Sequence, residues 1–166
     1  MFTPRRMRRA RQKLSDEEVK RILTENTSGV LSVIGKDGYP YSVPLSFVYI
    51  YNKIFFHSAK EGHKIEAVEN NDKASFCIID ADDVKPEKFL TNYKSVIVFG
   101  KVKVVDDENV KALAIDAIAE KYYPNHPSEK QREIDNFKDS FAIIELDAEH
   151  ISGKQGIELV VREQTV

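Results

Sequence analysis

Residues 29–49 read GVLSVIGKDGYPYSVPLSFVY, and this segment sets the expected architecture of the chain. Apolar and β-branched residues fill Val30 to Ile34, which predicts a strand. Lys36-Asp37-Gly38 is typical of a tight turn, and Tyr39 to Tyr49 then predicts a long return strand. The sequence therefore predicts an antiparallel pair at this point.

Four further segments share the short, apolar character of buried strands. They are Ile54–Ser58, Ala74–Ile79, Ser95–Val105 and Phe141–Leu146. The polar segment Asp80–Phe89 is predicted to be a loop, and a polar tail is predicted from Ile151 onward. About six strands with short connections and helices between them indicate a small antiparallel barrel.

Capping side chains mark where several helices begin. Ser15 and Glu18 form a capping box ahead of a short apolar stripe, so a helix is predicted from Asp16 to Glu25. Three more helices are predicted: a short one near Gly62–Val68, one after Asp106 or Asp107, and one from Ser128 to near Phe137. These helices are expected to lie around the barrel.

The composition is that of one globular domain. The chain has 166 residues, of which 42% are hydrophobic and 31% charged, enough to bury a core. No run reaches the ~18 apolar residues of a membrane span, and the N-terminus lacks the apolar segment of a signal peptide. The single cysteine, Cys77, indicates a reducing compartment, so a cytoplasmic location is expected. With four histidines and no metal-ligand motif, no metal site is expected.

The first 13 residues differ from the rest in charge. They contain no acidic residue and six basic ones. The basic residues are Arg5, Arg6, Arg8, Arg9, Arg11 and Lys13. Such an arm can contact nucleic acid, but the acidic remainder offers no basic face to continue the contact. A solvated terminus, or one that lies over an acidic partner surface, is therefore favoured, with neither a nucleic-acid nor a membrane partner. The expected organisation is an arm at 1–13, a domain at 14–154 and a tail at 155–166.

Residues 56–64 read FHSAKEGHK and contain the clearest candidate for a ligand site. A strand ends here, a short polar loop follows, and a helix begins near Gly62. The free N–H groups of a first helical turn favour an anion, and His63 and Lys64 would add positive charge. Ser58 can donate a hydroxyl, so a phosphate monoester would fit. A solvated surface loop is the alternative that this spacing alone leaves open.

Two prolines, Pro40 and Pro44, mark the second candidate segment. Proline cannot donate to a sheet, so the strand from Tyr39 is predicted to be an edge strand or to contain a bulge. Its unpaired main-chain groups could contact a flat heterocycle. Protection of the edge against aggregation is an equally good explanation.

The chain resembles a known family in several blocks. They are Met7 to Arg9, Gly29 to Val33, Asp37 to Leu45, Phe56 to Ala59, Glu61 to Lys64, Tyr93 to Gly100, and Ile151 to Lys154. In these blocks the sequence is similar to the flavin-binding split-barrel family of pyridoxamine phosphate oxidase-like proteins, and within it to the nitroimidazole-resistance branch. The resemblance implies a mostly β (α+β) fold, a six-stranded antiparallel split β-barrel with peripheral helices.

The resemblance also implies a homodimer that binds FMN at the interface between its subunits. The residues expected at the cofactor are Ser42, Val43, Pro44, Leu45, His57, Ser58, His63, Lys64, Ser95 and Val96. By this resemblance, the first four lie along the flavin ring and the histidine–serine pair lies between ring and phosphate. His63 and Lys64 contact the phosphate, and the last two reach the flavin bound mainly by the other subunit.

The sequence departs from true pyridoxamine phosphate oxidases, which carry an arginine-rich phosphate clamp. Tyr41 and His63 stand where that clamp has arginine, and the chain has no tryptophan. Oxidation of pyridoxamine phosphate is therefore not expected. The resemblance to the nitroimidazole-resistance branch implies instead an FMN-dependent reduction of a small planar electrophile such as a nitroaromatic. A non-enzymatic carrier or sensor of flavin or another cofactor is the alternative. No catalytic residue is assigned; His57 is the candidate acid to test, with orientation of the cofactor as its more conventional role.

Overall fold

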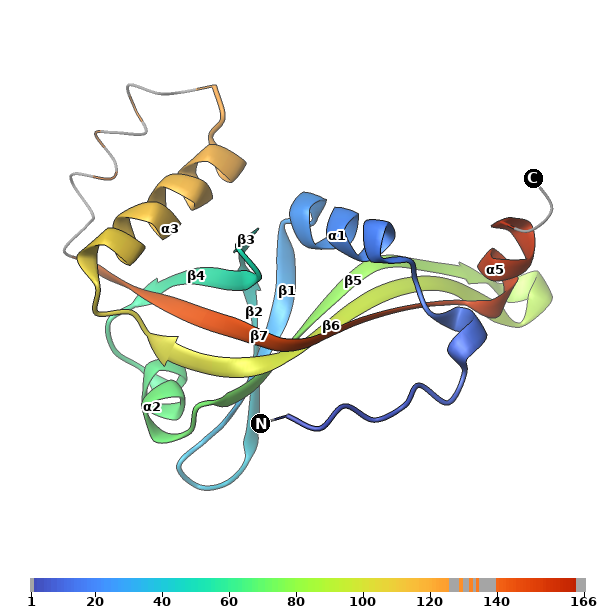
Figure 1. Ribbon diagram of the computed structural model, residues 1–166, viewed down its shortest axis with the longest axis horizontal. Helices are drawn as coiled ribbons and strands as arrows, with labels where there is room; N and C mark the ends of the chain where they lie inside the picture. The colour runs from blue at the N-terminus through green and yellow to red at the C-terminus, as the bar shows by residue number, and fades with distance from the viewer. Residues whose placement is uncertain (1, 126–128, 130–131, 133, 135–139, 164–166) are drawn as a thin grey trace.

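The computed structural model describes residues 2–125, 129, 132, 134 and 140–163. Within them one antiparallel sheet of seven strands has the order β2-β1-β5-β6-β7-β4-β3. The strands are β1 (Ser28–Ile34), β2 (Pro40–Ser46), β3 (Val48–Ile50), β4 (Lys53–Ala59), β5 (Lys73–Lys85), β6 (Leu90–Val104) and β7 (Phe141–Gln155). Figure 1 shows the sheet curling around its core.

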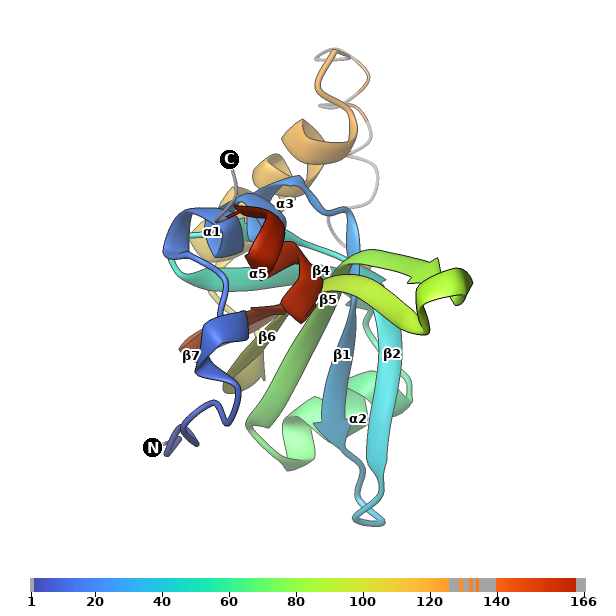
Figure 2. The same ribbon diagram turned by 90° about the vertical axis from the view of Figure 1, so that its right-hand side faces the viewer.

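Helices surround this sheet, as predicted. They are α1 (Asp16–Glu25), α2 (His63–Asn70), α3 (Glu108–Tyr122) and α5 (Ile157–Glu163), with 3₁₀ turns η1 (Ala10–Gln12) and η2 (Pro86–Lys88). Helices α1 and α2 lie at opposite sides of the barrel (Figures 1 and 2). The helix predicted from Ser128 to Phe137 falls largely outside the described residues. Among the described helices, none is long and apolar enough to cross a bilayer.

The predicted fold class is confirmed, but the described sheet has seven strands and not six. The single return strand predicted from Tyr39 to Tyr49 is wrong, because the chain breaks at Phe47 into β2 and β3. The N–H of Phe47 donates to the Tyr122 hydroxyl at 3.0 Å, and its side chain is fully buried. A side chain of α3 thus satisfies the backbone group that a continuous ladder would have used.

The loop predicted at Asp80–Phe89 is also wrong. Strand β5 continues to Lys85, η2 makes the turn, and β6 begins at Leu90. Figures 1 and 2 show this hairpin extending away from the barrel, so its polar composition reflects its exposed faces. Likewise β7 runs on to Gln155, paired with Lys94, where a polar tail was predicted from Ile151.

Aromatic rings fill the centre of the barrel. Phe76 contacts both Phe47 and Phe56 edge to face, with ring centroids 4.9 and 5.0 Å apart. A second, smaller apolar cluster lies under α3 and includes Phe55, Ala114 and Ile143. Strand β4 therefore packs against apolar groups on both of its faces.

The N-terminal arm is only partly a solvated terminus. Its six basic side chains are exposed, as predicted. Phe2, however, stacks on Phe99 with ring centroids 4.5 Å apart, and Gln12 and Leu14 are buried. Apolar contacts that the charge pattern did not indicate hold these parts of the segment against the sheet.

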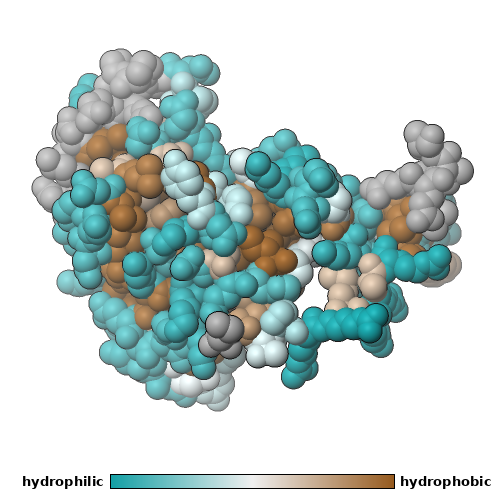
Figure 3. Space-filling model, viewed as in Figure 1, coloured by the Kyte–Doolittle hydropathy of each residue, from teal (hydrophilic) through white to brown (hydrophobic). Residues whose placement is uncertain are grey.

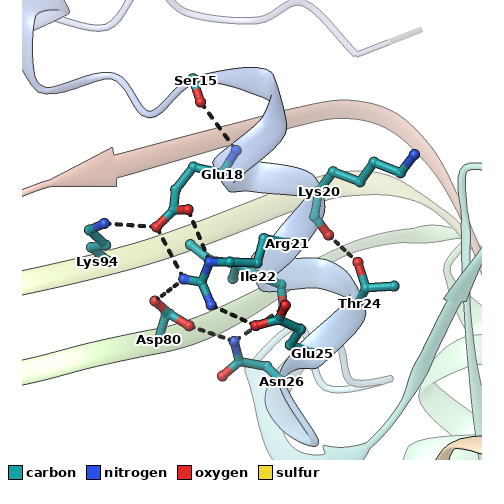
Figure 4. Close-up of polar contacts among 10 residues, drawn as sticks. All are labelled: Ser15, Glu18, Lys20, Arg21, Ile22, Thr24, Glu25, Asn26, Asp80 and Lys94. Atoms are coloured by element: carbon teal, nitrogen blue, oxygen red, sulfur yellow. Dashed lines mark hydrogen bonds and ion pairs between the residues drawn. The ribbon is translucent and has the colours of Figure 1, made fainter.

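A network of ion pairs fastens α1 to the base of the long hairpin (Figure 4). Arg21 of α1 contacts Glu18 at 2.9 Å and Asp80 of β5 at 2.7 Å. Lys94 of β6 contacts the same Glu18 at 2.7 Å. The hydrogen bonds from Arg21 and Lys94 lower the pKa of Glu18 to about 2. These ion pairs therefore hold α1 against both β5 and β6.

We expect Glu18→Gln to lower the free energy of unfolding at pH 7 by about 1–2 kcal/mol, a value reduced for partial exposure. Because the folded-state pKa of Glu18 is lowered, its stabilising effect is complete above the unfolded pKa. The gap between variant and wild type should therefore close as pH falls from about 5 toward 2. Urea unfolding across this range measures the gap.

Glu25→Gln is the matched control, because Glu25 contacts the same arginine but its side chain is 65% exposed, against 25% for Glu18. Its effect should be smaller at pH 7. Equal effects of the two substitutions would mean that Glu18 has no special place in the network.

Candidate functional site

Strand β2 is an edge strand, which confirms the prediction from its prolines. It stands first in the sheet and pairs only with β1, where Pro44 lies opposite Val30. Tyr41, Val43 and Leu45 pack against the core, whereas Ser42 and Pro44 are exposed. The free edge of β2 lies near β4, since the two strands are in contact. Among the described strands β2 has no ladder partner on this side, so its main-chain groups there are not used by sheet pairing.

The end of β4 and the start of α2 form the second part of the site. His57 is exposed, and Ser58 is buried on the opposite face of the strand. Gly62 caps α2 with φ at 117°, in a region that side chains rarely adopt, and no side chain caps the helix there. A Cβ added at Gly62 would meet nothing within 4 Å. There is therefore free space beside Gly62, at the start of α2.

A ring stack joins these two parts. The Tyr41 ring on β2 and the His63 imidazole at the start of α2 lie 4.3 Å apart between centroids, with 25° between their planes. Both positions are ones where the sequence departs from an arginine clamp. In this chain they hold the helix N-terminus beside the edge strand by stacking.

Lys64 is the unusual charge of this region. Its side chain is partly buried, and burial lowers its pKa. No hydrogen bond or ion pair joins it to any residue that the structure describes. A desolvated cation beside the positive end of a helix favours an anionic ligand.

The structure brings together most, but not all, of the predicted cofactor residues. Those on β2, β4 and α2 gather where these elements meet. Ser95 and Val96 lie on β6, three strands from β2 in the sheet, or roughly 14 Å at ordinary strand spacing. The Val96 side chain is fully buried in the core, and Ser95 is half-exposed. Within one chain these two residues do not join the site.

A cavity of about 890 Å³ adjoins the site and was not predicted. Its described walls are Ser46 of β2, His57, Ser58 and Ala59 of β4, Ile115, Ile118, Ala119 and Tyr122 of α3, Tyr123, Glu129, Ile134 and Ser140, and Phe141 and Ile143 of β7. Apolar residues on both faces of β4 were the sequence signal for it. In the part of the chain that is described, no cluster of three potential metal ligands occurs.

Comparison with known proteins identifies the family and the fold of this chain. The family model described as pyridoxamine 5′-phosphate oxidase matches residues 15–155. A candidate 5-nitroimidazole antibiotic resistance protein from Bacteroides thetaiotaomicron superimposes with a TM-score of 0.72 at 20% identity, covering 86% of each chain.

Two other solved structures share the fold. For a FAD-binding protein from Mesorhizobium loti the TM-score is 0.65 at 25% identity, covering 87% of this chain and 97% of that one. For the heme storage protein HutZ from Vibrio cholerae it is 0.66 at 17% identity, covering 85% and 94%. No curated protein sequence matches significantly.

We expect Lys64→Met to leave the ligand-free protein as stable as wild type at pH 7, or more stable, because it removes a desolvated charge without a partner. The folded-state pKa of Lys64 is lowered, so its charge destabilises the fold below that pKa. Any difference between the two proteins should therefore disappear above about pH 10.4. Thermal unfolding in phosphate-free buffer measures this difference.

Added inorganic phosphate should raise the unfolding temperature of wild type and of the control Lys60→Met, whose side chain is exposed. It should have little effect on Lys64→Met. A loss of stability in Lys64→Met without phosphate would show that Lys64 already has a stabilising partner.

Proposed function

The chain belongs to the pyridoxamine 5′-phosphate oxidase family, and on this premise we propose that it is an FMN-binding oxidoreductase that reduces a small planar electrophile, such as a nitroaromatic. Lys64, a partly buried cation without a partner in the described chain, is the observation that carries the proposal. A phosphate monoester supplies the negative charge that this position lacks. The lone cysteine agrees with a cytoplasmic protein.

The residues present fit the parts of FMN. The phosphate would accept hydrogen bonds from Lys64 and from the uncapped first turn of α2. The flavin ring would lie along the open edge of β2, from Ser42 to Leu45, and Ser58 would donate its hydroxyl between ring and phosphate. The open space at Gly62 admits the phosphate without displacing a side chain.

Bound flavin supplies the transfer of two electrons from a reduced nicotinamide to the acceptor. The protein would hold the flavin in place. Main-chain groups of β2 would orient its ring, and the Tyr41–His63 stack would fix the helix end that binds its phosphate. His57 stands where the site meets the cavity. Its imidazole N–H can donate a proton to the reduced acceptor or hold the cofactor in place.

The outer face of the sheet supports a homodimer. Pro44, Val30, Cys77 and Ile97 lie side by side across β2, β1, β5 and β6, on the face turned away from the core. Ile97 is 37% exposed and Ile79, near the same row, is 63% exposed. An apolar sheet face of this kind favours a second subunit. Ser95 borders that face, where it would meet the partner's flavin.

We predict that Lys64→Met weakens FMN at least tenfold and riboflavin very little, because a charge-assisted contact to phosphate is worth about 1.5–3 kcal/mol. Titration of flavin absorbance and fluorescence measures both affinities, with Lys60→Met as the control. If the variant lost the same affinity for both flavins, Lys64 would not contact the phosphate. If the protein bound FAD more tightly than FMN, FAD would be the cofactor. Oxidation of a reduced nicotinamide with a nitroaromatic acceptor separates an enzyme from a carrier.

The dimer gives a second prediction. Ile97→Arg places a charge on the apolar sheet face, so it should shift the protein to monomers and release flavin at the same time. The control is Leu113→Arg, because Leu113 is 43% exposed on α3, away from that face. Sedimentation across a dilution series, with and without FMN, measures the assembly. A wild-type monomer that keeps FMN at full affinity would contradict the interface.

A further inference from the structure

The walls of the cavity under α3 are mostly apolar. Ile115 and Ile118 of α3 face Phe141 and Ile143 of β7 across it, and His57 of β4 lies at its side. Figure 3 shows apolar side chains gathered around α3 and the strands beside it. Among the described residues of the wall there is no lysine or arginine. An anionic compound would lose its hydration here without gaining a countercharge.

The cavity has room for more than a single ring. A cavity of about 150 Å³ already holds benzene, whereas this one measures about 890 Å³. Pockets that bind drug-sized ligands span about 300–1,000 Å³. The space therefore suits two or more fused rings.

The cavity meets the proposed flavin site at the end of β2 and along β4, where His57 and Ser58 lie. Ser46 follows directly after the β2 stretch assigned to the ring, and both Ser46 and His57 line the cavity. The phosphate residues His63 and Lys64 do not line it. A molecule in the cavity would lie beside the flavin ring, with its polar end at His57.

We propose that this cavity is the acceptor site and that it selects uncharged, apolar compounds of two or more fused rings over anionic ones. The inference rests on the proposed flavin site and adds the substrate class. For a quinone of this class the reaction balances: a reduced nicotinamide gives a hydride, solvent gives a proton, and the products are the hydroquinone and the oxidised nicotinamide.

The test compares two probes of similar size and different charge, 2-(hydroxymethyl)anthraquinone and anthraquinone-2-sulfonate. Calorimetry on the FMN-loaded protein measures the affinity of each. The uncharged probe should bind at least tenfold more tightly than the sulfonate. Ile118→Trp fills the cavity, so it should weaken the uncharged probe at least tenfold while FMN affinity stays unchanged. Ile118→Ala, which removes apolar contacts without added bulk, should weaken it severalfold.

Leu113→Trp is the control, because Leu113 is exposed on the same helix and does not line the cavity. It should change neither affinity. If both probes bind wild type equally, or if neither Ile118 variant affects the uncharged probe, the acceptor site is overturned while the flavin proposal stands. If the wild-type protein binds no FMN, the flavin proposal fails and this inference fails with it.

Discussion

The unpaired charge of Lys64 is the constraint on which the candidate site depends. Partial burial costs the Lys64 ammonium hydration energy. No acidic side chain among the described residues forms an ion pair that would offset this cost. The first turn of α2 adds further positive potential instead of compensating it. The Tyr41–His63 stack holds this helix end against β2, so the charge cannot simply swing away with the helix. An anion would complete the arrangement.

Around this charge the fold separates three tasks. In the proposed function the start of α2 would bind the phosphate and the free edge of β2 would contact the flat ring, while α3 covers an apolar cavity beyond His57. The rigid part is the barrel, whose aromatic centre lies behind all three. The same solved fold occurs in a FAD-binding protein and in a heme storage protein, so the side chains at these places determine what is bound.

The features that were predicted correctly depend on residues close together in the sequence. The Ser15 cap placed the start of α1 at Asp16, and the prolines placed β2 at an edge, because each effect acts within a few residues. The break at Phe47 could not be predicted, since its cause is Tyr122, 75 positions away. The hairpin beyond Asp80 was missed because exposed strands have the composition of loops. The position of Ser95, three strands from β2, follows from the strand order, and the cavity depends on the packing of α3 on β4; neither is set by local sequence.

The most direct measurement of the central claim is the pH titration of the ³¹P resonance of FMN bound to the protein. A free phosphate monoester takes up its second proton near pH 6. Held by Lys64 and the first turn of α2, the dianion is favoured, so the account predicts a shifted resonance that stays constant from about pH 5.5 to 8. A bound resonance that titrates near pH 6, as free FMN does, would place the phosphate in solvent and contradict the account.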